Sequence, residues 1–244
     1  MPTESSIDVP ALQVEGVGVS YHRVPACRNV SLSVHAGECL AVVGANGAGK
    51  SSLVAAIAGL EPLASGRILL NGADVSRLRA HKRARLGLAL VPENRHLFPE
   101  MTVHETLQLA ARRDRVGASG WTLEAVHELF PRLRERAGSM AGNLSGGERQ
   151  MLAVARGLLL NPDVMMLDEP SAGLAPAVVE EMITALRALL DGGIAMLLVE
   201  QSVYAARMLG DRVVVMQDGD VVREGGKEVL GDDEGLRRAY LGAG

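Results

Sequence analysis

A glycine-rich segment near the start of the chain has the residue types that hold a phosphate. It reads Gly44-Ala-Asn-Gly-Ala-Gly-Lys50-Ser51 and fits the P-loop spacing. Glycines let backbone N–H groups curl around a phosphate, and the positive end of the following helix adds to the potential. We expect Lys50 to reach the β- and γ-phosphates of a nucleotide and the Ser51 hydroxyl to bind Mg²⁺. The alternative is a glycine turn before an ordinary helix.

Two adjacent carboxylates, Asp168 and Glu169, follow an apolar run at residues 164–167. A carboxylate at the end of a buried strand, beside a phosphate cradle, can hold Mg²⁺ through water. Glu169 is then placed to polarise an attacking water as a general base. Two surface acids that cap a strand are the alternative, and the glycine-rich segment upstream counts against it. Together the two segments predict that the chain binds and hydrolyses ATP.

A serine–glycine turn, Leu144-Ser-Gly-Gly-Glu-Arg-Gln150, precedes an apolar helix expected at residues 151–160. Ser145 is a candidate helix N-cap, and Glu148 three residues later completes a capping box. The two glycines add exposed N–H groups at the positive end of the helix, which makes the turn a ready anion site. The turn contributes to phosphate chemistry only if it faces a phosphate.

The overall composition excludes several classes of protein. The chain has 244 residues, of which 48% are hydrophobic and 2% aromatic, so a large core must be built from aliphatic side chains. The net charge of −4 does not indicate a protein that binds nucleic acid. No apolar stretch approaches the ~18 residues that cross a bilayer. The basic run is expected to be a solvated helix face rather than a binding patch; it comprises Arg77, Arg79, Lys82, Arg83 and Arg85.

The reactive side chains outside these segments give no metal or disulfide pattern. Cys27 and Cys39 lack CxxC spacing and are expected to be reduced, buried thiols of a cytosolic protein. The six histidines show no pair at metal-ligand helix spacing, so no zinc site is predicted. Residues 1–10 are polar, without the apolar segment of a secretory signal, and are expected to form a disordered lead-in.

The chain alternates strands and helices, which predicts an α/β domain over residues 11–244 with a mostly parallel sheet. Alternating residues at 12–21 and 30–34 predict antiparallel strands of an N-terminal β-subdomain. Helical periodicity over 102–136 predicts a helical subdomain, about 95–160, inserted in the core. The remaining expected strands are 39–43, 67–70, 87–91, 164–167, 194–199, 213–216 and 221–222, and the other helices are 50–60, 177–190, 203–209 and 234–241.

The serine–glycine heptad, with the segments around it, resembles the signature of ATP-binding-cassette (ABC) ATPases, from about Leu12 to the C-terminus. The resemblance implies a P-loop NTPase core and a head-to-tail dimer, a homodimer or a pair with a related paralogue, with two ATPs between the subunits. In that arrangement one subunit contributes Gly44, Asn46, Gly47, Ala48, Gly49, Lys50, Ser51 and Ser52, and its mate contributes Ser145, Gly146 and Gly147. Tyr21 matches the aromatic residue that stacks on adenine, although a lone tyrosine at a strand end can equally be packing. Residues 171–174 match the loop that communicates between the two sites.

Two positions depart from the common pattern of that family. Glu93 stands where most members carry a glutamine, and Gln201 stands where most carry the switch histidine. Gln201 can donate an amide hydrogen bond to the γ-phosphate but carries no charge. An ionised Glu93 only accepts hydrogen bonds, so it must face Mg²⁺ or a positioned water. These departures place more weight on Glu169, with Lys50 and Gln201 as the other catalytic candidates and Ser51, Glu93 and Asp168 as the metal candidates.

The same departures, with Phe98-Pro-Glu-Met-Thr-Val103 and Tyr240-Leu-Gly242, resemble an ATPase subunit of bacterial branched-chain amino-acid importers. The resemblance implies transmembrane permease subunits, a second ATPase subunit and, indirectly, a periplasmic solute-binding protein as partners. It also implies a peripheral location on the cytoplasmic face of the inner membrane. The alternatives are an importer of the urea or amide type, a soluble ABC ATPase and a regulatory ATP-binding module. The compact insertion argues against long-armed DNA-repair members, and the intact Asp168-Glu169 pair argues against a purely regulatory module.

Overall fold

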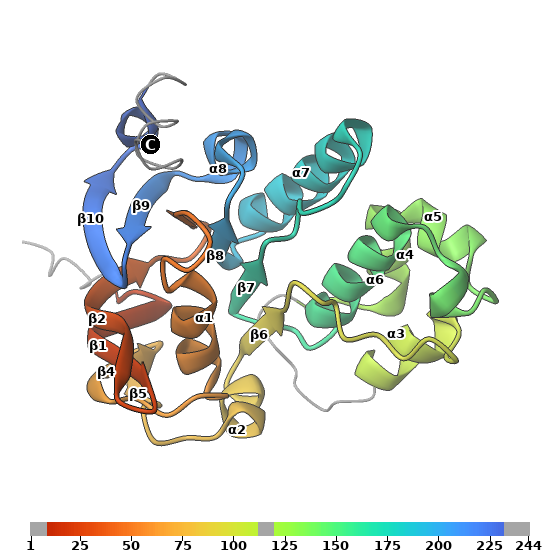
Figure 1. Cartoon of the computed structure of the whole chain (residues 1–244). Coiled ribbons are helices and arrows are strands. Elements are labelled where there is room, and N and C mark those ends of the chain that lie inside the picture. Colours follow the sequence, from red (N-terminus) through yellow and green to blue (C-terminus); the bar gives the residue numbers. More distant parts are fainter. Residues whose placement is uncertain (1–8, 112–119, 232–244) are drawn as a thin grey trace, which may run out of the picture.

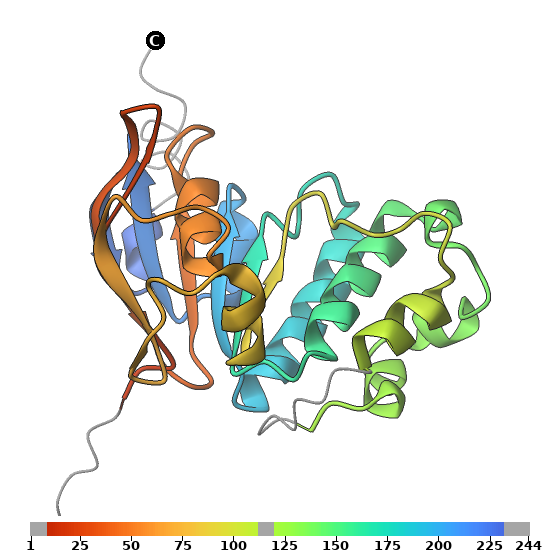
Figure 2. The same ribbon diagram turned by 90° about the horizontal axis from the view of Figure 1, so that it is seen from below.

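The computed structural model describes residues 9–111 and 120–231. The predicted lead-in at 1–10, except its last two residues, and the predicted helix at 234–241 lie outside the described residues, as does the Tyr240-Leu-Gly242 segment. The described residues fold into two sheets and a helical subdomain that stands to one side of them (Figures 1 and 2).

The smaller sheet is antiparallel and has the strand order β2-β1-β4-β5. Its strands are β1 (Leu12–Tyr21), β2 (Val24–Val34), β4 (Ser65–Leu70) and β5 (Ala73–Asp74). Apolar side chains that alternate along β1 and β2 point into one core cluster, while most of the intervening residues are half-buried in β1 and exposed in β2. This is the one-sided burial expected of an antiparallel sheet. The strand β2 begins six residues before the predicted strand at 30–34.

The larger sheet has the order β10-β9-β3-β8-β7-β6. All its neighbouring pairs are parallel except β9 with β10. Its strands are β3 (Cys39–Val43), β6 (Leu88–Val91), β7 (Val164–Asp168), β8 (Ala195–Glu200), β9 (Arg212–Gln217) and β10 (Asp220–Gly225). Every residue of β3, β7 and β8 is buried, because helices or the other sheet cover both faces. Because β3, β8 and β7 are parallel neighbours, their carboxyl ends meet at one edge of the sheet, where ligands of open α/β sheets bind.

The helices cover the two faces of the larger sheet. Helix α1 (Lys50–Ala58) lies between the two sheets and shares a core cluster with both (Figure 2). The opposite face carries α6 (Gly146–Leu158) and α7 (Pro176–Asp191), whose buried residues belong to a second cluster. Helix α8 (Val203–Leu209) packs on β3, and the short 3₁₀ helix η2 (Lys227–Leu230) lies against β9 and β10.

The inserted helical subdomain comprises α3 (Val103–Ala111), α4 (Leu123–Leu129), α5 (Pro131–Glu135) and the 3₁₀ helix η1 (Ala141–Asn143), which pack around α6. Helix α6 thus belongs to both parts of the molecule, because its buried face contacts α3 and α5 as well as β6. None of the helices in the part of the chain that the structure describes has both the length and the apolar character needed to span a bilayer.

The prediction of a solvated basic face is wrong for one of its five residues. Arg83, in α2 (Ala80–Arg85), is only 2% exposed, whereas its basic neighbours in the run lie at the surface. Its guanidinium donates to the carbonyl oxygens of Ala56 and Ile57, each at 2.8 Å, and also to those of Ser76 and Leu78. The last turn of a helix leaves carbonyl groups without helical partners, and Arg83 satisfies them for α1. The residue therefore fixes the far end of the helix that carries Lys50.

Candidate nucleotide-binding site

The glycine-rich loop connects β3 to α1 and takes a shape that side chains would block. Gly49 is the N-cap of α1 with φ at +97°, and no side chain caps the helix there. A Cβ atom on Gly49 would lie 2.3 Å from the carbonyl oxygen of Ala26, and one on Gly44 would lie 2.4 Å from that of Met216. Both positions therefore require glycine. The loop leaves the N–H groups of the first turn of α1 without a side-chain cap, as an anion site at a helix end requires.

Lys50 curls back over this loop. Its side chain is buried, and Nζ donates to the carbonyl oxygens of Gly44 at 2.8 Å and Ala45 at 3.1 Å. The same Nζ atom lies 3.5 Å from Oε1 of Glu169. The ammonium is thus held at the centre of the loop, where it can exchange these contacts for phosphate oxygens.

Ser51 and Asp168 supply oxygen ligands of the kind that Mg²⁺ prefers. The hydroxyl of Ser51, on α1, donates to Oδ1 of Asp168 at 3.4 Å, and Asp168 is the last residue of β7. Burial raises the pKa of Asp168; the charges of Glu169 and Glu93 raise it further, while the Ser51 hydrogen bond opposes this shift. A hydroxyl and a carboxylate that approach each other from two elements fit a hard divalent cation, which would also offset the repulsion between the three acids.

Glu169 follows β7 with its backbone in the left-handed region, at φ +47°. Its N–H donates to the carbonyl of Val199 at 2.8 Å, which fixes this unusual conformation to β8. Non-glycine residues held this way cost about 1–3 kcal/mol and concentrate at functional sites. The consequence here is that the Glu169 side chain points toward Lys50.

A cavity of about 410 Å³ joins these groups. The residues that line it are Ala26, Asn46, Gly47, Gly49, Lys50, Ser51, Ser52, Glu93 and Glu169. The structure therefore brings together the predicted cradle, the proposed base and Glu93, which follows β6. Gly44 and Ala48 line an adjoining cavity of about 470 Å³ against β9 and β10.

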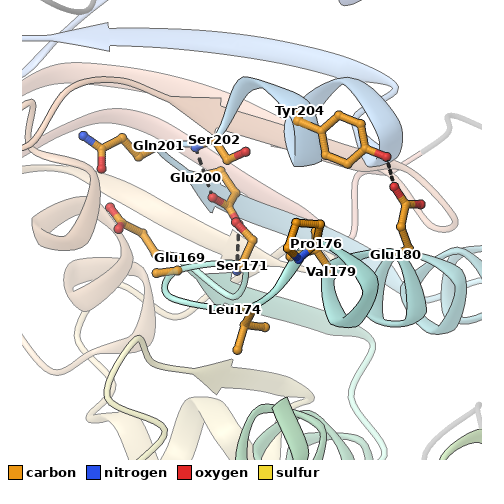
Figure 3. Close-up of a pocket in the computed structure, with 11 residues that line it drawn as sticks. Glu169, Ser171, Leu174, Pro176, Val179, Glu180, Glu200, Gln201, Ser202 and Tyr204 are labelled. Atoms are coloured by element: carbon orange, nitrogen blue, oxygen red, sulfur yellow. Dashed lines mark hydrogen bonds between the residues drawn. The ribbon is translucent and has the colours of Figure 1, made fainter. Parts of the chain in front are cut away.

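Besides Gly44 and Ala48, four predicted groups are not among the residues that line the 410 Å³ cavity. One is Asp168, which is hydrogen-bonded to the lining residue Ser51. Tyr21, at the end of β1, is 40% exposed. Gln201 lines a different cavity of about 800 Å³, which shares Glu169 with the first (Figure 3). The serine–glycine turn of Ser145 begins α6, on the side of the sheet that faces the helical subdomain.

The turn itself is the capping box that the sequence predicts. The hydroxyl of Ser145 accepts from the N–H of Glu148 at 3.2 Å, and the Ser145 N–H donates to the Glu148 carboxylate at 2.8 Å. These bonds lower the pKa of Glu148, and Arg136 lies 3.4 Å from its carboxylate. Helix α6 starts at Gly146, five residues before the predicted helix at 151–160, because the capping box compensates for the low helix propensity of two glycines.

Sequence reasoning missed two groups of residues that hold the site loops. Glu200, the last residue of β8, accepts from the N–H groups of Ser171 and Ser202. In α6, Gln150 accepts from Nε of Arg95 at 2.7 Å, and Arg156 donates to the carbonyl oxygens of Arg95 at 2.9 Å and His96 at 2.6 Å. Most of these bonds end on backbone groups, which no residue spacing reveals.

The fold and the cavity define a P-loop ATPase, a protein whose glycine-rich loop and strand-end carboxylates handle a nucleoside triphosphate. Residues 27–172 match the model of the family described as ABC transporter. Over 231 residues the chain is 37% identical to the high-affinity branched-chain amino acid transport ATP-binding protein BraG of Pseudomonas aeruginosa, covering 95% of this chain and 99% of that protein. The chain therefore belongs to the ABC transporter family, as an ATP-binding subunit that hydrolyses ATP.

Other relatives differ from one another in the transport that their names state. The chain is 34% identical to the probable branched-chain amino acid transport ATP-binding protein LivF of Archaeoglobus fulgidus, covering 95% of this chain and 98% of that one. It is 30% identical to the lipopolysaccharide export system ATP-binding protein LptB of Escherichia coli, covering 95% and 97%.

Solved structures of related cassettes superpose on most of the chain. The ADP conformation of MJ1267, an ATP-binding cassette of an ABC transporter, matches with a TM-score of 0.83 and 25% identity, covering 96% of this chain and 99% of that one. A dimeric post-hydrolysis state of the cassette MJ0796, bound to ADP and Pi, matches with a TM-score of 0.78 and 25% identity, covering 88% and 98%. The predicted fold, an antiparallel β-subdomain beside a mostly parallel sheet with helices, is confirmed.

Proposed function

We propose that this chain is the ATP-hydrolysing subunit that powers a membrane importer for branched-chain or related amino acids. Two relatives whose names state branched-chain amino acid transport support the solute class, at 37% and 34% identity over 95% of the chain. The lipopolysaccharide export relative, at 30%, favours an exporter as the second candidate. Fold and site geometry are common to both, so the choice rests on partners.

The observation that carries the enzymatic part is the meeting of Lys50, Ser51 and Glu169 around one cavity, with Asp168 hydrogen-bonded to Ser51. ATP would lie with its β- and γ-phosphates on the loop between β3 and α1, where Lys50 exchanges its two carbonyl contacts for phosphate oxygens. Tyr21, exposed at the end of β1, is placed to offer its ring to adenine.

The hydrolytic roles follow from the positions of the acids. Ser51 and Asp168 would hold Mg²⁺, which supplies charge neutralisation to the phosphates, and Glu93 faces the same cavity as a further ligand or water-holding group. Glu169 would accept the proton of the attacking water, and the ammonium of Lys50 lies 3.5 Å from its carboxylate. Gln201 would donate to the γ-phosphate or the water through its amide.

The remaining side of the triphosphate would be closed by a second ATPase subunit. The turn of Ser145, Gly146 and Gly147 does not line the cavity of its own chain, so it would meet the nucleotide of a partner. The dimeric MJ0796 structure supports such pairing in a related cassette. The partner is a second copy of this chain or a paralogue, and transmembrane permease subunits would hold the pair at the cytoplasmic face of the membrane.

The substitution Glu169→Gln tests the enzymatic assignment. It keeps the shape of the side chain but removes its basicity, so ATP turnover should fall by about 10²–10⁴-fold while ATP still binds. Steady-state phosphate release and equilibrium ATP binding measure the two effects. Glu180→Gln, on the surface of α7, is the matched control and should retain the wild-type rate. Turnover of Glu169→Gln close to wild type would remove Glu169 from the role of base.

Co-purification tests the transport assignment. The tagged chain would be recovered from cross-linked membranes of its native cell, and its partners identified by mass spectrometry. Recovery of amino-acid permeases together with a related second ATPase would support the proposal. Recovery of lipopolysaccharide-type export components would favour the second candidate, and recovery without any permease would favour a soluble ATPase.

A further inference from the structure

Glu200 is a carboxylate buried at the edge of the sheet where the nucleotide site lies. It ends β8 and is only 1% exposed. Its Oε1 accepts from the N–H of Ser171 at 3.0 Å, and its Oε2 accepts from the N–H of Ser202 at 3.2 Å (Figure 3). Among the described residues, no cation forms an ion pair with it. The hydrogen bonds from these two backbone N–H groups compensate for the burial of its charge.

A buried carboxylate is energetically unfavourable compared with a neutral side chain of similar shape. Its presence here points to a role for its two hydrogen bonds. Burial disfavours the charged form and raises the pKa of Glu200, while the hydrogen bonds from Ser171 and Ser202 oppose this shift. Burial of an ionised carboxylate is strongly unfavourable unless hydrogen bonds or an opposite charge compensate for the lost water. Hydrogen bonds to a charged acceptor are roughly twice as strong as neutral ones, so both loops are held firmly.

The two loops held by Glu200 are those that carry the polar groups facing the γ-phosphate in the proposed function. Ser171 lies two residues after Glu169, whose own N–H is bonded to Val199 O, the residue before Glu200. Ser202 directly follows Gln201 and is the N-cap of α8, where no side chain caps the helix. A single side chain thus spans the segment after β7 and the segment after β8. Both Glu169 and Gln201 line the cavity into which Glu200 faces (Figure 3).

We propose that Glu200 is a positioning residue, which ties the loop of Glu169 to the loop of Gln201 so that both side chains keep a fixed spacing during hydrolysis. The inference rests on the proposed role of Glu169 as general base. Glu200 itself touches neither phosphate nor water in this account. Its two oxygens are both needed, because each accepts from a different loop.

The test is Glu200→Gln, which keeps the side-chain shape but offers one acceptor oxygen, so that an amide NH₂ faces one of the two backbone N–H groups. One loop is released, and a displacement of about 1 Å at a catalytic group costs on the order of 10²-fold in rate. We expect kcat, counted per ATP-binding site, to fall about 10–100-fold while the KM for ATP changes less than about twofold. Glu180→Gln makes the same chemical change in a side chain that bonds only Tyr204 in the same cavity, and should leave both constants unchanged.

A second variant removes a donor instead of the acceptor. Ser202→Pro deletes the N–H that Glu200 binds, and the backbone φ of −77° at Ser202 suits proline. Ser202→Pro should lower kcat with the KM for ATP unchanged. This variant tests the positioning role of Glu200 if Glu200→Gln does not fold. Wild-type kcat in the folded variant, or a rise in KM that accounts for the whole loss, would overturn the positioning role. Failure of the proposed function is a separate outcome, since it would appear as undiminished turnover in Glu169→Gln.

Discussion

The two glycine-flanked helix starts of this protein, at α1 and at α6, are built in opposite ways. Helix α1 begins after Gly49 with no side-chain cap, no acidic residue in its first turn, and the ammonium of Lys50 beside it. Helix α6 begins after Ser145 with a complete capping box, in which Glu148 takes part. One helix start is left open for a ligand, whereas the other satisfies part of its own N–H groups.

The difference indicates a division of labour between the two helix starts. The open start at α1 has the charge and the N–H groups to bind a triphosphate within a single chain. The start at α6 carries a carboxylate that is turned back into the capping box and lies 3.4 Å from Arg136. In the proposed dimer this start would close over an anion already held on α1 of the partner. Changes at α1 should therefore abolish nucleotide binding, and changes at α6 should spare binding but lower turnover.

Lys50→Ala should have the largest effect. It removes the ammonium group of the cradle, and a charge-assisted contact with phosphate contributes on the order of several kcal/mol in a partly buried site. ATP affinity, measured by calorimetry on the isolated chain, should fall by about 10²-fold or more, and turnover should fall with it. Lys82→Ala on the exposed face of α2 is the control. Unaltered ATP affinity in Lys50→Ala would break the assignment of the cradle.

Gly146→Asp should spare binding and lower turnover. A Cβ atom at Gly146 meets only Leu174 Cδ2, at 3.9 Å, and an acid in the first turn suits the helix dipole, so the fold should tolerate the change. The added charge opposes a γ-phosphate brought to the turn by a partner. We expect ATP affinity of the monomer within about twofold of wild type and turnover lowered by about 10²-fold. Gly146→Ala separates the steric effect from the charge, and full turnover of Gly146→Asp would count against the closing role of α6.

Ser145→Ala should destabilise the chain by about 1 kcal/mol, the usual cost of a lost N-cap. Thermal or urea unfolding measures this, and Ser145→Asp, which retains an acceptor oxygen, should recover the stability. Gly49 of α1 forms no side-chain cap, so no N-cap hydrogen bond contributes to the stability of α1. An unchanged midpoint in Ser145→Ala would show that the capping box contributes nothing.

The smallest effect is a pH dependence at α6. The capping bonds hold the pKa of Glu148 below its usual value, so the stability that Glu148 contributes is fully present above the ordinary glutamate pKa and is lost as pH falls through the lowered value. The difference in unfolding free energy between wild type and Glu148→Gln should therefore be largest near neutral pH and shrink in acid. A difference that grows on acidification would have the wrong sign.

The sequence predicts the sheet core and the elements around the cradle most closely, because their signals are local. The apolar run of β3 and the periodic segment of α8 have the bounds expected of them. Helix α1 ends at Ala58 rather than residue 60, since Gly59 adopts the left-handed conformation that terminates a helix. The start of β2 at Val24 was missed because polar residues and Pro25 mask its alternation.

The site shows a similar division between local and tertiary signals. Spacing along the chain is enough to nominate Lys50, Ser51, Asp168 and Glu169. The fold brings Lys50, Ser51 and Glu169 to one cavity and places Asp168 within hydrogen-bond distance of Ser51. The buried partners of backbone groups have no such signature. Arg83, which was expected in solvent, satisfies carbonyl oxygens of α1, and Glu200 binds two loop N–H groups. Both functions depend on which chain segments the fold places side by side.

The measurement that tests the division of labour most directly is a crystal structure of the Glu169→Gln variant with ATP and Mg²⁺, accompanied by X-ray scattering of the same complex in solution. The account predicts a dimer in which the β- and γ-phosphates lie on Lys50 of one protomer and within hydrogen-bond distance of the Ser145 turn of its mate. A nucleotide bound to Lys50 with every γ-oxygen remote from any Ser145 turn, and scattering that agrees, would contradict it.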